Sequence, residues 1–125
     1  MKLSKKKLRK FLKTNSANSE WDQKPLLFWA LDRPTIVNIL LNSGADANIT
    51  IELLKGTYVT PLSMCKIMWR KLKPMEMISK KYALASVYNS ACNTIENLKK
   101  TMELLHSFGG VEGHYRNYIS LDIRD

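Results

Sequence analysis

The sequence of 125 residues has few of the residue types that form covalent frameworks or metal sites. Two cysteines, Cys65 and Cys92, permit one disulfide but no disulfide framework. Both lie in segments with periodically spaced apolar residues, which favours buried free thiols in a reducing compartment. Two histidines, His106 and His114, stand eight residues apart without a cysteine or acid at ligand spacing, which argues against a zinc site. No apolar run reaches about 18 residues, and no apolar segment follows the charged N-terminus, so neither a membrane span nor a secretory signal is expected.

The sequence also lacks the patterns that accompany catalysis. It has five glycines but no glycine-rich phosphate-binding loop. Its acids are scattered and show no paired placement for acid–base chemistry, as at Asp22, Asp32, Asp46, Glu76, Glu96 and Glu103. We therefore predict a protein that is not an enzyme, with no catalytic residues, no cofactor, no metal ion and no small-molecule substrate.

The net charge of +9 is unevenly distributed. Residues 1–13 contain seven lysines and arginines and no acid, whereas the other 112 residues contain 13 bases and 11 acids. A nucleic-acid-binding domain would be expected to carry its basic residues on a folded face. The high isoelectric point therefore describes a terminal segment more than the domain.

The N-terminal segment has the pattern of a short amphipathic helix. Ser4 can cap its start, and Leu8, Phe11 and Leu12 form a narrow apolar stripe at spacings of three and four. One interpretation is a capping helix, docked by this stripe and polar outside. The other is an arm that binds RNA or an anionic membrane surface. We prefer the capping helix.

Residues 24–48 predict two short helices and a sharp stop. Pro25 suits the first turn of a helix, which residues 32–34 break, and Thr35 opens a second, nearly apolar helix. Gly44 can take the left-handed conformation that ends such a helix. The pattern returns at Thr60-Pro61-Leu62 and, far along the chain, at residues 104–110.

At residues 24–48 the chain resembles an ankyrin repeat, with Pro25, Leu26 and Ala30 matching its first helix. The second helix of the repeat matches at Ile36, Val37, Ile39, Leu40 and Leu41. The segment that ends the repeat matches at Gly44, Ala45, Asp46 and Asn48. Lys24 and Leu27 replace the threonine and histidine of the family pattern. A second repeat over 60–110 would be interrupted by an insertion at about 70–93.

The resemblance implies one all-α domain over 1–125, a short stack of antiparallel helix pairs with about six helices. The basic helix at 1–13 would cap it, and the insertion would be helical. We expect residues 14–23 to form a loop and residues 45–59 an extended or hairpin-like connection without a paired sheet. Pro74 predicts a break or a helix start, and residues 89–94 a turn. The tail at 111–125 is either a final cap or a flexible partner-binding peptide.

The resemblance also implies a protein-binding scaffold without catalysis, which binds through loop tips and the inner row of first helices. Those positions are Trp21, Gln23, Leu31, Asp32, Tyr58 and Val59. The insertion adds a second candidate surface at Trp69, Arg70, Lys71 and Lys73, since an aromatic beside arginine is typical of interface anchors. Each of these residues could instead serve packing, which we prefer for Trp69. The basic character predicts an acidic protein partner and salt-sensitive association.

The first functional hypothesis is thus a small adaptor or inhibitor in the cytoplasm. The sequence is rich in lysine, asparagine and isoleucine, a composition typical of proteins from intracellular bacteria and large viruses. Such proteins can be delivered into a host cell, where they act on host factors. The second hypothesis is nucleic-acid or anionic-membrane binding through residues 2–13 and the bases of 66–81. The third is that the chain is a fragment of a larger multidomain protein.

Overall fold

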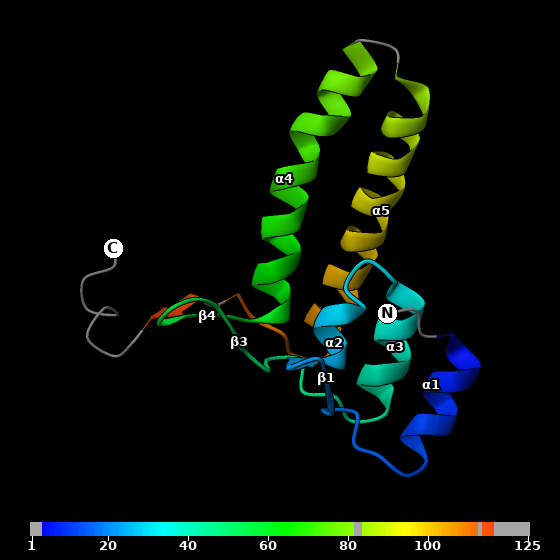
Figure 1. The fold of residues 1–125 in the computed structure, drawn as a ribbon, viewed down its shortest axis with the longest axis vertical. Coiled ribbons are helices and arrows are strands. Elements are labelled where there is room, and N and C mark those ends of the chain that lie inside the picture. The colour runs from blue at the N-terminus through cyan, green and yellow to red at the C-terminus, as the bar shows by residue number, and fades with distance from the viewer. Residues whose placement is uncertain (1–3, 82–83, 113, 117–125) are drawn as a thin grey trace.

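The computed structural model describes residues 4–81, 84–112 and 114–116 and shows a mixed architecture (Figure 1). The helices of this part are α1 (Lys5–Leu12), α2 (Leu26–Trp29), α3 (Pro34–Asn42), α4 (Pro61–Lys81) and α5 (Ala85–Ser107). The strands are β1 (Glu20–Trp21), β2 (Lys24–Pro25), β3 (Ile51–Leu54), β4 (Thr57–Val59) and β5 (His114–Arg116). The prediction of an all-α fold with about six helices is therefore wrong: five helices and two small antiparallel sheets form the described structure.

The first sheet begins in the predicted loop at residues 14–23 and ends where the first helix of residues 24–48 is expected to start. Strands β1 and β2 pair antiparallel, with Trp21 opposite Lys24. The chain reverses at Asp22 and Gln23, whose φ angles of 50° and 65° place both residues in the left-handed region. Two consecutive residues with positive φ form the tight turn that matches the twist of a hairpin. Neither residue is glycine, so the usual residue signal for this turn is absent.

The second sheet lies where an extended or hairpin-like connection is expected; the hairpin is present, but its strands are paired, so the prediction that no paired sheet forms is wrong. Strand β3 pairs with β4, Ile51 lying opposite Val59, and the turn contains Gly56 with a φ of 80°. The Glu52 carboxylate accepts a hydrogen bond of 2.8 Å from the Gly56 N–H, which supports the turn. Strand β5, from the tail, pairs with β4 on its other side. The rest of the tail, residues 117–125, lies outside the described residues.

Three signals for helix ends act as predicted, namely the Ser4 cap, the Gly44 stop and the helix start after Thr60. The Ser4 hydroxyl accepts a hydrogen bond of 3.1 Å from the Lys7 N–H at the start of α1. Helix α3 begins at Pro34 and is followed by Gly44 with a φ of 97°. Helix α4 begins after Thr60, as predicted, and the Thr60 hydroxyl donates a 2.7 Å hydrogen bond to the Val111 carbonyl.

The two longest helices contradict the predicted interruptions. Helix α4 continues through Pro74, and α5 is unbroken across residues 89–94, where a turn was expected (Figure 1). An interior proline costs about 3 kcal/mol relative to alanine, because it lacks the N–H and crowds the preceding turn. Here α4 and α5 pack against each other as an antiparallel hairpin, and we attribute the continuity of both helices to this packing.

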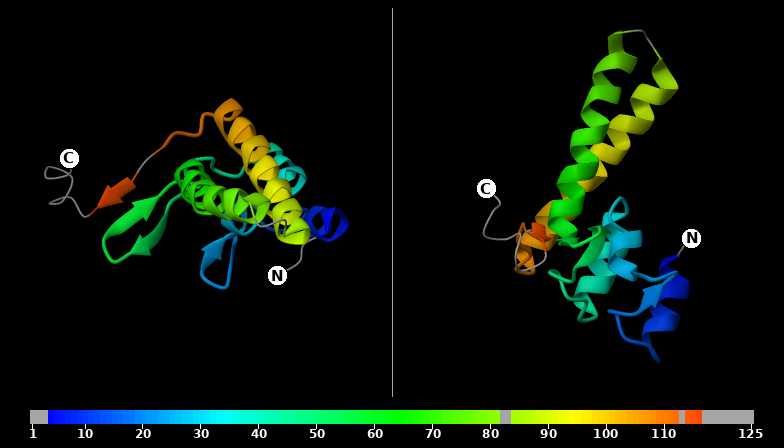
Figure 2. Two further views of the ribbon diagram at one scale, coloured as in Figure 1. Left: turned by 90° about the horizontal axis from the view of Figure 1, so that it is seen from above. Right: turned by 60° about the vertical axis from the view of Figure 1, so that its left-hand side comes forward.

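The hydrophobic core occupies one end of this hairpin. It gathers buried side chains from all five helices; among the most buried are Leu8, Leu27, Leu40, Leu62, Leu98 and Leu105. Helix α3 contacts α1, α2 and α5, as its nearly apolar sequence predicted. The other end of the hairpin projects away from this body (Figure 2), and we refer to it, residues 72–81 and 84–94, as the distal hairpin.

Asparagine side chains tie the C-terminal ends of α1, α3 and α5 together. The Asn18 side-chain oxygen accepts a 2.7 Å hydrogen bond from the Asp46 N–H. The Asn48 amide donates to the Gly109 carbonyl at 3.1 Å and accepts from the Val111 N–H at 2.8 Å. These bonds join loops that are 28 to 63 residues apart in the sequence.

Replacing Asn48 with alanine should lower the free energy of unfolding by about 1–2 kcal/mol, because two bonds between distant loops are lost. Asn42 is the matched control, since its amide bonds only within α3, to the Asn38 carbonyl and side chain. Urea unfolding of both alanine variants measures the difference. An equal, small effect of the two changes would show that the Asn48 bridge contributes little.

Candidate protein-binding surfaces

Neither metal-binding nor membrane-spanning features occur in the described part of the chain. There, no group of three or more histidine, cysteine, aspartate or glutamate residues is placed to hold a metal ion. Nor does any described helix combine the length and apolarity that crossing a membrane requires.

The two thiols lie in different environments. Cys65 is fully buried, and this burial raises its pKa to about 12. Cys92 is partly buried, and its thiol donates a 3.3 Å hydrogen bond to a Glu76 carboxylate oxygen. This bond and that from Lys73 lower the pKa of Glu76.

We expect iodoacetamide at pH 8 to alkylate Cys92 while Cys65 stays unmodified until the protein unfolds. A thiol with a pKa near 12 is about one part in 10⁴ thiolate at this pH, and burial also denies the reagent access. Mass spectrometry of peptides after native and denatured labelling measures this order. Alkylation of Cys65 at a rate similar to that of Cys92 would contradict the burial of Cys65.

The β1–β2 hairpin holds two tryptophans in a fixed arrangement. The ring centroids of Trp21 and Trp29 are 5.0 Å apart at 77°, an edge-to-face contact. The Trp29 indole N–H donates a 2.8 Å hydrogen bond to the Trp21 carbonyl, and the Lys24 ammonium lies 4.0 Å from the centroid of a Trp29 ring. Trp21 remains 46% exposed, and Gln23 is exposed in the adjacent turn. Both predicted contact residues of this hairpin are thus accessible.

The other predicted loop-tip positions divide between surface and core. Asp32 is exposed, and Tyr58 is exposed on β4. Leu31 and Val59, at 1% and 0% exposed, pack in the core, which removes them from the candidate contact surface. Their apolar side chains fill space between the helices, a role that their position in the repeat pattern did not reveal.

The predicted insertion surface lies on α4 and is also divided. Arg70 and Lys71 are exposed, whereas Trp69 is partly buried and packs against the core. Lys73 lies 5.3 Å from a Trp69 ring centroid and 3.2 Å from a Glu76 carboxylate oxygen. The packing interpretation preferred for Trp69 thus agrees with its position.

The distal hairpin carries exposed apolar side chains that the sequence pattern did not predict. The side chains of Met77 and Ile78 are 68% and 55% exposed, and three others are 39–49% exposed. We call this set the distal patch: Met75, Met77, Ile78, Leu84 and Val87. Because a hairpin of two helices can bury only facing stripes, its outer sides remain exposed.

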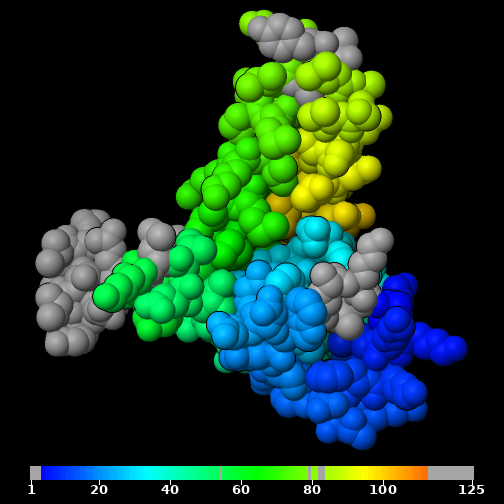
Figure 3. Space-filling view, viewed as in Figure 1, coloured from blue at the N-terminus to red at the C-terminus, as the bar shows by residue number. Residues whose placement is uncertain are grey.

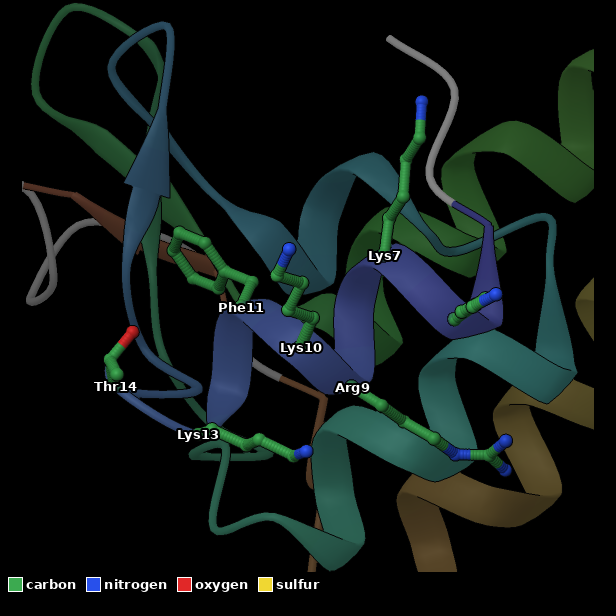
Figure 4. A pocket seen from close by; sticks show the side chains of 7 residues that line it. Lys7, Arg9, Lys10, Phe11, Lys13 and Thr14 are labelled. Carbon is green, nitrogen blue, oxygen red and sulfur yellow. The ribbon is translucent and has the colours of Figure 1, made fainter.

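A hollow beside α1 does not form a convergent site. It has a volume of about 940 Å³ and is lined by Lys6, Lys7, Arg9, Lys10, Phe11, Lys13 and Thr14. Figure 4 shows these side chains pointing away from α1 in different directions. A ligand site needs polar groups that converge on one position. This hollow therefore offers a diffuse positive surface.

Comparison with known proteins found no family model, no curated protein and no solved structure that matches this chain.

Proposed function

We propose that the protein is a non-catalytic protein-binding module that recruits or blocks another protein through the distal hairpin. The observation that carries this proposal is the distal patch, five large apolar side chains that are 39–68% exposed within thirteen residues of sequence. Single exposed apolar residues are normal, whereas many large ones on one projecting element are typical of an interaction surface. Catalysis has no comparable observation in its favour.

The position of the patch supports the same proposal. The distal hairpin stands clear of the body (Figure 3), so a partner could approach it from several sides. Its other end is anchored by buried residues such as Leu62 and Leu98. A rigid, anchored element loses little conformational entropy when it binds.

We further propose that the body is related to ankyrin repeats and that the protein works in a reducing compartment such as the cytoplasm. The left-handed Gly44 after α3 and the asparagine bonds between the loops that follow the helices support this relationship. The buried Cys65 supports the reducing compartment. A protein delivered into a host cell would meet the same conditions.

A pair of double variants tests the binding function. Met77→Asp with Ile78→Asp should abolish capture of a specific protein from lysates of the source cell and of host cells. The matched control is Leu53→Asp with Phe108→Asp, two apolar residues that are 43% and 42% exposed away from the distal hairpin. Mass spectrometry identifies the captured proteins, and thermal unfolding checks that both variants fold. If both variants retain the same partners, or if only nucleic acid is recovered, the proposal fails.

A second candidate function is binding of nucleic acid or an anionic membrane by α1. The observation in its favour is the exposed face of α1, where Phe11 is 37% exposed beside Arg9, Lys10 and their basic neighbours. Lys6→Glu with Lys10→Glu should then eliminate salt-sensitive binding to single-stranded RNA or to phosphatidylserine vesicles. Unchanged binding in this variant would exclude α1 as the binding element.

A further inference from the structure

The distal hairpin contains an open groove between its two helices. The groove has a volume of about 320 Å³ and is lined by Leu72 and Met75 of α4 and by Ser86, Val87, Ser90, Ala91 and Thr94 of α5. The α5 side consists mainly of small residues, which cannot fill the space beside the longer side chains of α4. The groove is thus a consequence of unequal side-chain sizes on the two helices.

A polar cluster connects α4 and α5 near this groove. The Glu76 carboxylate accepts hydrogen bonds from Lys73 on its own helix and from Cys92 on α5, at 3.2 and 3.3 Å. Because these groups satisfy one another, they fix the position of α4 relative to α5. We infer that the groove is preformed.

The surroundings of the groove are strongly basic. Helix α4 contains six lysines and arginines and one acid, Glu76, which is engaged in the polar cluster. No aspartate or glutamate occurs between residues 77 and 95. Lys71, Lys80 and Lys81 are exposed, Lys71 lying one helical turn before Met75. Any occupant of the groove therefore approaches a positive field.

We propose that this distal groove binds an amphipathic α-helix of a partner protein, with a large apolar side chain seated between α4 and α5 and acidic residues facing Lys71 and Lys81. The inference rests on the proposed protein-binding function and names its partner chemistry. Recognition of a helix in a groove uses apolar anchors at spacings of three, four and seven. Ile78, about 4.5 Å further along α4 than the groove residue Met75, extends the apolar surface beyond the groove at a matching spacing.

Charge and shape favour an acidic partner helix over two other occupants of the groove, a second copy of this chain and an anionic bilayer. A second copy of the chain would bring two basic α4 helices together, and like charges at an interface oppose association. An anionic bilayer would satisfy the charge but not the shape. A bilayer favours a convex apolar surface, whereas the groove is concave and contains the hydroxyl-bearing Ser86, Ser90 and Thr94. The Thr94 hydroxyl donates to the Ser90 carbonyl at 3.0 Å.

The test selects binders from a display library of random 16-residue peptides against the full chain. Peptides that bind the Met77→Asp, Ile78→Asp variant equally well are removed. The proposal predicts selected peptides with apolar residues at helical spacing, flanked by aspartate and glutamate. Their affinity should fall at least tenfold when salt is raised from 50 to 500 mM, because the acidic flanks face exposed lysines.

Two matched pairs of variants locate the binding site of the selected peptides. Ser90→Leu fills the groove and should weaken binding at least tenfold, whereas Asn93→Leu, on the same helix but outside the groove lining, should change it less than twofold. Lys71→Glu with Lys81→Glu should weaken binding at least tenfold, and the control Lys99→Glu with Lys100→Glu should not. Circular dichroism checks that all variants fold.

Several outcomes would overturn the inference. These are selected peptides that are basic or lack helical spacing, peptides that are indifferent to Ser90→Leu, and failure to select any peptide. Groove-dependent binding to phosphatidylserine vesicles, or a stable dimer in sedimentation that Ser90→Leu dissociates, would also overturn it. If Met77→Asp with Ile78→Asp still abolishes capture of a protein in any of these cases, the binding function stands and only the acidic helix is excluded.

Discussion

Replacing Leu8 with alanine is expected to lower the free energy of unfolding by about 2–5 kcal/mol, the range observed for large-to-small changes in a core. Leu8 is 0% exposed and belongs to the core cluster, and α1 contacts α3. The alanine would leave a cavity between the two helices. If α1 is a capping helix that covers the core, deletion of residues 1–13 should unfold the body.

Phe11→Ala is the control for Leu8, because Phe11 belongs to the same apolar stripe but is 37% exposed. Phe11→Ala should lower the free energy of unfolding by less than about 1 kcal/mol, as substitutions at the surface usually do. Urea unfolding followed by tryptophan fluorescence measures both variants. If Leu8→Ala were as mild as Phe11→Ala, α1 would be a detachable arm, and the nucleic-acid or membrane hypothesis would gain support.

Gly110→Ala is expected to lower the free energy of unfolding by about 2–4 kcal/mol, a large effect for the addition of one methyl group. A Cβ at this position would lie 2.8 Å from the Leu105 carbonyl oxygen, which also accepts a 2.7 Å hydrogen bond from the Gly110 N–H. Since the obstructing atom belongs to the backbone of α5, the loop itself must move. That movement would displace Val111, which bonds to Asn48 and Thr60.

Gly109→Ala separates this steric effect from backbone strain. Gly109 has a φ of 84°, but a Cβ there meets nothing within 4 Å. Gly109→Ala should lower the free energy of unfolding by about 1–2 kcal/mol, because alanine is strained in the left-handed conformation. Thermal unfolding of both variants should rank Gly110→Ala as more destabilising. The reverse order would show that the loop at residues 109–111 can relax without disturbing the asparagine bonds.

The helix ends could be predicted because their signals are local. The Ser4 hydroxyl bonds within one turn, and Gly44 ends α3 through its own φ of 97°. The apolar sequence of α3 likewise predicted a helix enclosed by neighbours. Each of these features depends on residues within one or two turns, which the sequence displays directly.

The strands and the continuity of the long helices depend on distant parts of the chain. Strand β5 pairs with β4 across more than fifty residues, with Tyr58 opposite Tyr115. Helix α4 passes through Pro74 while it packs along α5. The pattern at 89–94 contained turn-forming residues, but tertiary packing overrode this local preference. Such effects follow from contacts that a single sequence does not reveal.

The candidate site was predictable only in part. Trp21, a loop-tip position in the repeat pattern, is 46% exposed and thus accessible to a partner. Leu31 and Val59 were assigned to the surface from the repeat pattern alone and are buried. The distal patch was hidden because helical periodicity identifies an apolar face without showing whether a neighbour covers it. The basic, acid-poor stretch around Glu76 was its one sequence signal.

The central claim, that the distal patch is the protein-binding surface, is tested most directly by site-specific photocrosslinking. A photoreactive amino acid replaces Met77, which is 68% exposed, and in a separate protein it replaces Phe108, which is 42% exposed outside the distal hairpin. After irradiation in lysates of the source cell and of host cells, residue 77 should yield a discrete crosslinked protein that residue 108 does not. Identical products from both positions, or none from residue 77, would contradict the claim.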